Sequence, residues 1–255
     1  MPSFDRAAAA AQAAIFEVKE NALIRQKFDS LLVPRATQVF AWGALSAEIG
    51  KLLAIKSEPS VLYRGLFVQT ISIFESYIKQ VTYAVLEMRR VKADSYEKLP
   101  EGVRLANIFN TGTALRAVYD GQYNGTTIDH AAYMKSIGTC SSGETAYTLN
   151  AEGFVLDVGN CKLGSINKHF KKLGAKGDFS DAICSDAALQ KWSGTTSVRK
   201  TSDLVEATLD EYVDRRNTIV HRVDASMTFV PQDIEDVTHF MNLLTEAIKR
   251  AARAC

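Results

Sequence analysis

Residues 60–91, SVLYRGLFVQTISIFESYIKQVTYAVLEMRRV, predict one long helix that begins after Pro59. Proline favours the first turn of a helix, and the apolar side chains that follow recur at helical spacing. One side of this helix would carry Phe67, Ile71, Phe74, Ile78, Val81 and Val85. Another side would carry Leu62, Leu66 and Ile73. A helix that is apolar on two sides is usually packed on both, so we expect this helix at the centre of the fold.

Helical patterns continue on both sides of this central segment. The predicted helices are 4–32, ended by Pro34, then 37–55, 100–119, 163–173, 180–192, a helix capped by Thr201 or Ser202 that runs through Val220, and a last one that begins at Pro231. Residues 121–159 differ, because 121–143 is rich in Gly, Thr and Ser and 147–158 partly alternates. They predict an irregular insertion with a short β-hairpin, and 194–202 predicts a polar loop.

These elements predict an all-α fold, an antiparallel helical bundle in a single domain that spans residues 1–255. The N-terminal helices would occupy 1–56, the bundle core 57–120 and 200–255, and the insertion with its hairpin and short helices 121–199.

The composition excludes several classes of protein. Hydrophobic residues make up 47% of the chain, which excludes intrinsic disorder. The longest stretch without a charge, Ala36 to Ala47, has 12 residues, whereas a membrane-spanning helix needs about 20. The formal net charge is +1, so any attraction to nucleic acid must come from local patches. The four cysteines (Cys140, Cys161, Cys184 and Cys255) form no C-x-x-C pair, and we expect reduced thiols in a cytoplasmic protein.

Residues 214–222, DRRNTIVHR, carry the side chains that could perform chemistry. The apolar stripe of the predicted helix is defined here by Leu209, Val213 and Val220. Arg216 falls on that stripe, and Asn217 and His221 lie at its edge. A guanidinium on a buried face is costly unless it is paired or lines a wet cleft. Either Arg216 forms a structural ion pair, with Glu75 as a candidate acid, while His221 ends the helix favourably, or these polar residues form a site.

The motif Arg216-Asn217-x-x-x-His221 resembles the Arg-x4-His signature of the HEPN superfamily, helical domains found in many prokaryotic toxins and defence ribonucleases. Further segments resemble the RiboL-PSP branch of this superfamily, and the likeness spans about residues 60–253. These segments are Phe74-Glu75-Ser76-Tyr77, Gly159-Asn160, residues 166–174 (INKHFKKLG) and the exit His221-Arg222.

The resemblance implies an endoribonuclease that needs no metal ion and works as a homodimer, with two copies of the motif facing each other across a two-fold axis. RNA, with tRNA as a candidate, would supply its own 2′-hydroxyl as nucleophile, leaving a 2′,3′-cyclic phosphate and a 5′-hydroxyl. His221 would be the acid/base, Arg216 the phosphate clamp, and Asn217 a positioning group. Glu75 would orient Arg216 or His221.

The implied setting is a toxin or an anti-phage defence effector. Its activity would be restrained by an inhibitor protein, by a nucleotide signal, or by residues 121–159 covering the cleft.

Other basic residues leave two interpretations open. Arg215 and Arg222 flank the motif and would either contact RNA phosphates or stay solvated. Lys168, Lys171 and Lys172 would form either an RNA-binding flap or the polar face of a short helix.

Cys161, His169 and Cys184, with Cys140, fit no zinc-binding spacing, so we expect no metal and no cofactor. The competing function is a non-catalytic HEPN module that binds a nucleotide or RNA, or dimerises, with Arg216 and His221 serving the fold.

Overall fold

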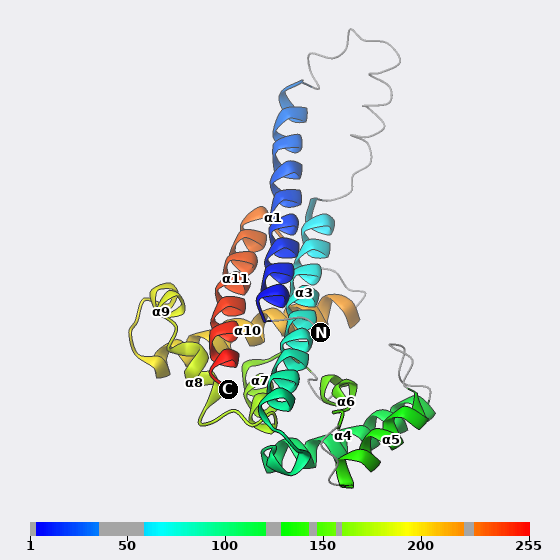
Figure 1. The fold of residues 1–255 in the computed structure, drawn as a ribbon. Helices are drawn as coiled ribbons and strands as arrows, with labels where there is room; N and C mark the ends of the chain where they lie inside the picture. The colour runs from blue at the N-terminus through cyan, green and yellow to red at the C-terminus, as the bar shows by residue number, and fades with distance from the viewer. Residues whose placement is uncertain (1–3, 36–58, 121–128, 143–146, 157–159, 222–226) are drawn as a thin grey trace.

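The computed structural model describes residues 4–35, 59–120, 129–142, 147–156, 160–221 and 227–255 (Figure 1). The helices are α1 (Phe4–Arg35), α3 (Pro59–Lys92), the 3₁₀ turn η2 (Tyr96–Lys98), α4 (Glu101–Tyr119), α5 (His130–Ser141), α6 (Ala151–Leu156), α7 (Leu163–Lys172), α8 (Phe179–Cys184), α9 (Ala187–Ser193), α10 (Val198–His221) and α11 (Pro231–Arg253). The described residues contain no strand, which confirms the all-α prediction.

Three long helices form the core. Helices α1, α3 and α11 stand side by side, and α1 runs antiparallel to the other two (Figure 1). The predicted central position of α3 is confirmed, because it packs against α1 and α11 and also touches α6 and α10. Its predicted stripe is buried completely: Phe67, Ile71, Phe74, Ile78, Val81 and Val85.

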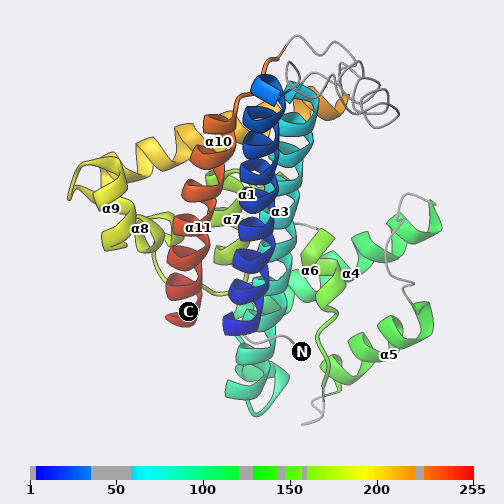
Figure 2. The ribbon, with the colours of Figure 1, turned by 90° about the horizontal axis from the view of Figure 1, so that it is seen from above.

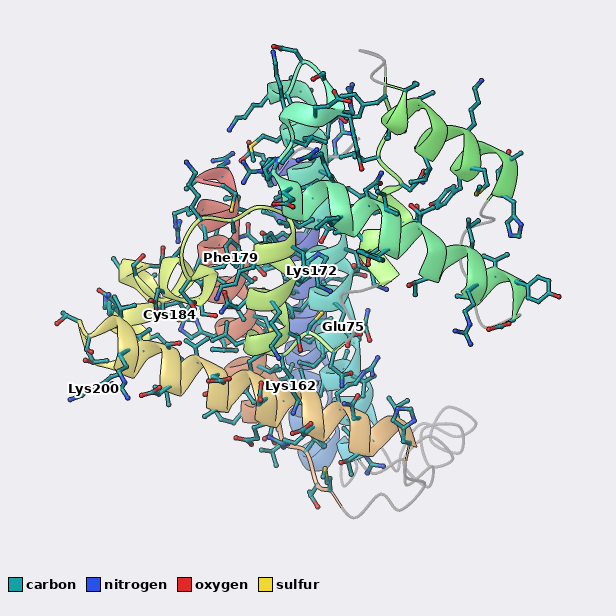
Figure 3. The ribbon with its side chains drawn as sticks, turned by 90° about the horizontal axis from the view of Figure 1, so that it is seen from below. Glu75, Lys162, Lys172, Phe179, Cys184 and Lys200 are labelled. Carbon is teal, nitrogen blue, oxygen red and sulfur yellow. The ribbon has the colours of Figure 1, made fainter. Side chains whose placement is uncertain are left out.

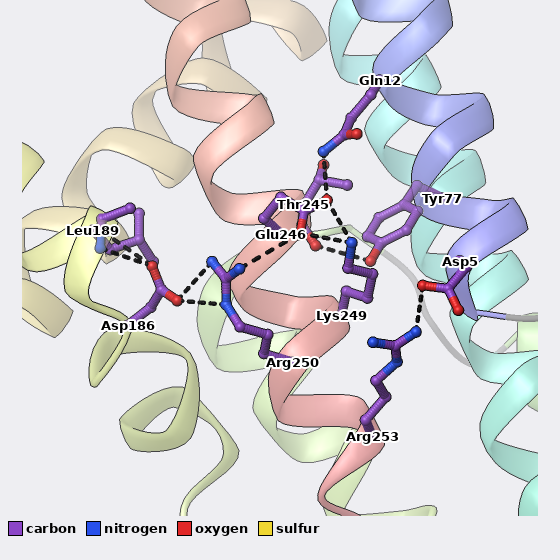
Figure 4. Close-up of polar contacts among 11 residues, drawn as sticks. Asp5, Gln12, Tyr77, Asp186, Leu189, Thr245, Glu246, Lys249, Arg250 and Arg253 are labelled. Carbon is purple, nitrogen blue, oxygen red and sulfur yellow. Dashed lines mark hydrogen bonds and ion pairs between the residues drawn. The ribbon is translucent and has the colours of Figure 1, made fainter.

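Polar contacts join α1 and α3 to the end of α11 (Figure 4). The Gln12 side-chain amide donates a hydrogen bond to the Glu246 carboxylate at 2.6 Å. Asp5 forms an ion pair with Arg253. The Tyr77 hydroxyl donates to the carbonyl oxygen of Thr245 at 2.9 Å. The N-terminal helix is therefore part of the core, not an addition outside it.

Helix α10 crosses the three core helices instead of lying along them (Figure 2). It packs against α3 and against the short helices α7, α8 and α9. Its inner face buries Thr201, Val205, Leu209 and Val213. The Asp186 side chain caps α9 and also pairs with Arg250 of α11 at 2.7 Å, which fixes the short helices beside the core.

Helices α4, α5 and α6 form a side lobe held together by buried polar groups. The Asn107 side-chain oxygen accepts from the backbone N–H of Asn150 at 2.9 Å, and the Asn150 amide donates to the Thr111 hydroxyl at 2.9 Å. Helix α6 approaches α4 so closely that a Cβ on Gly153 would lie 2.8 Å from the Asn110 backbone. Only glycine fits there without a shift of the backbone.

Several local predictions are wrong. Residues 147–156 form no hairpin: 147–150 have no regular secondary structure, and Ala151–Leu156 form helix α6, in which Phe154 and Val155 are buried in succession instead of alternating. The predicted helix 180–192 is two helices, since Asp186 starts a new one. Helix α10 begins at Val198, four residues into the predicted polar loop. Helix α1 continues through Pro34 to Arg35, and the predicted helix 37–55 lies outside the described residues.

Candidate active site at the end of helix α10

The last two turns of α10 carry the motif and project beyond the core (Figure 1). Burial is complete at Leu209 and Val213, but Val220 is 50% exposed. The prediction that Val220 continues the buried stripe is therefore wrong, because α10 crosses the core and passes its edge before the helix ends. His221 is exposed, and residues 215–219 are half-buried. The polar motif thus sits at the border between core and solvent.

Arg216 is held from two sides. Its Nη2 lies 3.2 Å from a carboxylate oxygen of Glu75 on α3, with the two side chains 22% and 19% exposed. Its Nη1 donates to the side-chain oxygen of Asn217 at 3.0 Å. The Nε of Arg216 is buried and has no hydrogen-bond partner among the described residues. The guanidinium is thus fixed in place and keeps N–H groups that are not used by Glu75 or Asn217.

His221 follows Asn217 by one helical turn, so the two side chains share a face of α10. The imidazole is exposed, where it can exchange protons with solvent or with a bound ligand. An arginine fixed by a carboxylate, with an exposed histidine five residues further along the same helix, offers one group to hold a phosphate and another to move a proton. The structure brings together Arg216, Asn217 and Glu75, and places His221 one turn along.

The segment before α7 closes the inner side of this site, which the sequence did not indicate. Lys162 forms ion pairs with Asp214 at 2.9 Å and with Asp210 at 3.7 Å, and so ties α7 to the motif helix (Figure 3). Cys161 is buried nearby. Burial, together with the nearby Glu75 carboxylate, raises the pKa of its thiol to about 12. The thiol therefore stays protonated near neutral pH and is unsuited to act as a nucleophile.

Arg215 points away from the motif and into the fold. It pairs with Asp233 at 3.3 Å and with Glu211 at 3.6 Å. Its guanidinium also lies over the rings of Phe67 and Phe229, 5.1 and 4.7 Å from their centres. These contacts favour a structural role for Arg215 over the predicted contact with RNA. Arg222 lies outside the described residues.

The predicted lysine flap does not contact the motif. Lys168, Lys171 and Lys172 are exposed on α7, which begins beside α10 and carries them away from it (Figure 3). Lys171 lies 3.5 Å from Asp178. At about 1.5 Å of rise per residue, these lysines lie roughly 9–15 Å along the axis from Lys162. Any role in RNA binding would be at a distance from the motif.

The cysteines and His169 have separate partners. The hydroxyl of Thr82 donates to the carbonyl oxygen of Ile78, so Nε2 of His169, 2.9 Å away, must donate to Thr82. Cys140 contacts Asn107 at 3.8 Å. All four cysteines are free thiols. Across the described ranges, no three metal-ligating side chains come together as a cation site.

A comparison with known families finds one family whose profile matches this sequence. The profile of the RiboL-PSP-HEPN family covers residues 45–253, which include Glu75 and the whole motif. The chain belongs to the RiboL-PSP-HEPN family. The functions of HEPN domains involve nucleotides or RNA, and many HEPN domains are ribonucleases. No curated protein and no solved structure is matched by this HEPN chain. In the described part of the chain, every helix is too short or too polar to cross a bilayer.

Proposed function

We propose that this HEPN chain is a metal-independent endoribonuclease that acts in the cytoplasm. One observation supports the proposal most strongly: Arg216 is clamped between Glu75 and Asn217 at 3.2 and 3.0 Å, while His221 remains exposed one turn along the same helix. A purely structural arginine would not need an exposed histidine beside it. Together, an arginine and a histidine can supply the charge stabilisation and the proton transfer that phosphodiester cleavage needs.

The proposed reaction uses the 2′-hydroxyl of RNA as the nucleophile. His221 takes the proton of this hydroxyl or delivers a proton to the 5′-oxygen as the P–O bond breaks. Arg216 binds the phosphate oxygens and stabilises the added negative charge of the transition state. Asn217 positions the phosphate, and Glu75 keeps the guanidinium oriented. The products are a 2′,3′-cyclic phosphate and a 5′-hydroxyl, so DNA is not a substrate.

The active form in this proposal is a homodimer. The exposed Val220 and His221 leave the end of α10 open to a second copy, which would place two motifs in one cleft. The biological role that we propose is a toxin or an anti-phage effector, restrained by an inhibitor protein or a nucleotide signal.

The test is cleavage of total tRNA and of a matched DNA strand by purified protein in EDTA. Arg216→Ala and His221→Ala should abolish cleavage of RNA, and Asn217→Ala should weaken it. His130→Ala changes an exposed histidine on α5 and serves as the matched control, which should cleave like the parent protein. Loss of activity in EDTA, or full activity of the His221 variant, would refute the mechanism.

The second candidate function is a non-catalytic RNA- or nucleotide-binding module. The ion pair of Arg216 with Glu75 favours it, because the same contact also stabilises the fold. This module would leave RNA intact in all five forms, the parent protein and the four variants. Its binding of RNA, measured by fluorescence anisotropy, would weaken in Arg216→Ala. In contrast, an intact ribonuclease should also slow the growth of cells that express it, and both catalytic substitutions should relieve that effect.

A further inference from the structure

A cavity of about 410 Å³ lies between α9, α10 and α11, away from the motif. It is lined on α10 by Thr208, Glu211, Tyr212 and Arg215. At about 100° per residue, these positions face the opposite side of α10 from Asn217 and His221. The volume falls in the usual range of small-ligand pockets, about 300–1,000 Å³. Nothing in the proposed ribonuclease mechanism uses this cavity.

Aromatic rings form one wall of the cavity. Phe240 of α11 lies between two of them, with ring centres 4.9 Å from Trp192 and 5.7 Å from Tyr212. Phe240 is buried, whereas Trp192 and Tyr212 are only half-buried. The faces of such rings attract cations and pack well against hydrocarbon stems. The wall therefore suits a ligand that combines both features.

Carboxylates surround the aromatic wall. Glu211, Asp233 and Asp236 line the cavity, and the basic groups among its described lining residues are the guanidinium of Arg215 and the imidazole of His239. That guanidinium is already paired with Glu211 and Asp233 and lies over Phe67 and Phe229. Burial, with the nearby carboxylates of Asp236 and Glu211, raises the pKa of the Tyr212 hydroxyl to about 12. An anion would be repelled here, and a cation attracted.

Asp236 is the lining carboxylate whose charge is least offset by a cationic partner in the protein. Asp233 accepts from the backbone N–H of Val230 at 2.8 Å and from Arg215, so both of its oxygens are engaged. Asp236 is exposed, and its contact in the cavity region is with the amide of Gln232 on its own helix, at 2.8 Å. A ligand head group that reaches Asp236 would replace a neutral partner with a charged one.

We propose that this cavity binds an organic cation, a guanidinium or alkylammonium group on a hydrocarbon stem. The stem packs on Trp192 and Tyr212, and the head group reaches Asp236 and Glu211. This chemistry is shared by free polyamines and by an arginine or lysine side chain of a protein partner. A bare metal ion fits poorly, because no three metal-ligating groups come together within the described residues.

The test follows tryptophan fluorescence in a Trp42→Phe background, where Trp192 is the only tryptophan, with calorimetry as the second readout, in about 0.15 M salt. The probes are agmatine and spermidine as free amines, Nα-acetyl-arginine amide as the side-chain form, and butylurea as a neutral analogue. We expect saturable binding of the cations and none of butylurea. Asp236→Asn should weaken binding by about tenfold, in line with loss of one charged partner. Asp203→Asn removes an exposed carboxylate of α10 that does not line the cavity, and should change nothing.

The relative affinities identify the source of the cation. Tighter binding of spermidine or agmatine indicates a free amine, and tighter binding of the arginine amide indicates a partner side chain. Absence of saturation up to about 10 mM would overturn the proposal. The proposal would also be overturned if Asp203→Asn weakened binding as much as Asp236→Asn does, or if butylurea bound as tightly as the cations. None of these readouts depends on RNA cleavage, so they stand apart from the test of the proposed ribonuclease.

Discussion

The ion pair between Glu75 and Arg216 should stabilise the folded chain by an amount that a double-mutant cycle can measure. At 3.2 Å and an effective dielectric constant of about 20, the direct attraction is about 5 kcal/mol. The free-energy cost of removing two charges from water offsets most of this attraction. Here the removal is incomplete, since about a fifth of each side chain stays exposed. We expect a coupling free energy of about 1–2 kcal/mol, above the 0.2–1 kcal/mol typical of exposed pairs.

The cycle uses Glu75→Gln, Arg216→Gln and the double variant, unfolded in urea and followed by circular dichroism. Each titration is run at two protein concentrations, because dimer formation adds to apparent stability. Glu87 and Arg90 provide a matched control on the same helix, with a 2.7 Å contact but side chains 31% and 41% exposed. Their cycle should give less than about 0.5 kcal/mol.

The outcome decides how Arg216 is held. A coupling for Glu75 and Arg216 no larger than that of the control pair would refute the reasoning, because the carboxylate would then not fix the guanidinium. Arg216 would in that case lack the rigid placement that the proposed phosphate clamp requires. A coupling near the expected size supports the clamp.

Three further predictions concern the fold. Gly153→Ala should cost about 1–3 kcal/mol of unfolding free energy because its Cβ would meet the α4 backbone at 2.8 Å, whereas Gly138→Ala, with no atom within 4 Å, should be neutral or stabilising in the same thermal scan. Thr82→Val leaves the buried Nε2–H of His169 without an acceptor and should cost about 1–3 kcal/mol in urea, which Thr82→Ser should largely restore. The folded chain keeps the Tyr212 proton up to about pH 12, whereas the unfolded chain releases it near pH 10, so the free energy of unfolding should fall as the pH rises across that interval. If this free energy falls with pH as steeply in Tyr212→Phe as in the parent protein, the prediction is contradicted.

The long helices α3 and α11 were predictable almost to the residue. The predicted helix 60–91 is observed as Pro59–Lys92, and Pro231 begins α11 as expected. In both, long runs of buried side chains repeat the helical period. The break at Asp186 was missed. Its signal was local, because aspartate is a favoured N-cap residue, but the apolar pattern obscured the end of the preceding helix.

The candidate site was predictable only in part. The pairing of Arg216 with Glu75 follows from the cost of a lone charge on a buried face, and the structure contains that contact. Cys161 and Lys162 could not be placed beside the motif, because their position depends on how α7 packs against α10. No periodicity relates segments that far apart. The exposure of Val220 was missed for a related reason: a helical wheel does not tell where a crossing helix leaves the core.

The pairing of α1 with α11 determines the order in which this chain can fold as it is synthesised. Asp5 and Arg253 are 248 positions apart, so their contact is among the most distant in sequence. While a ribosome is still translating the segment before Pro231, α1 and α3 lack the third helix that covers their shared apolar face. Nascent chains should therefore expose that face until late and depend on chaperones in the interval. A truncation within α11 should consequently release aggregates instead of a smaller folded protein.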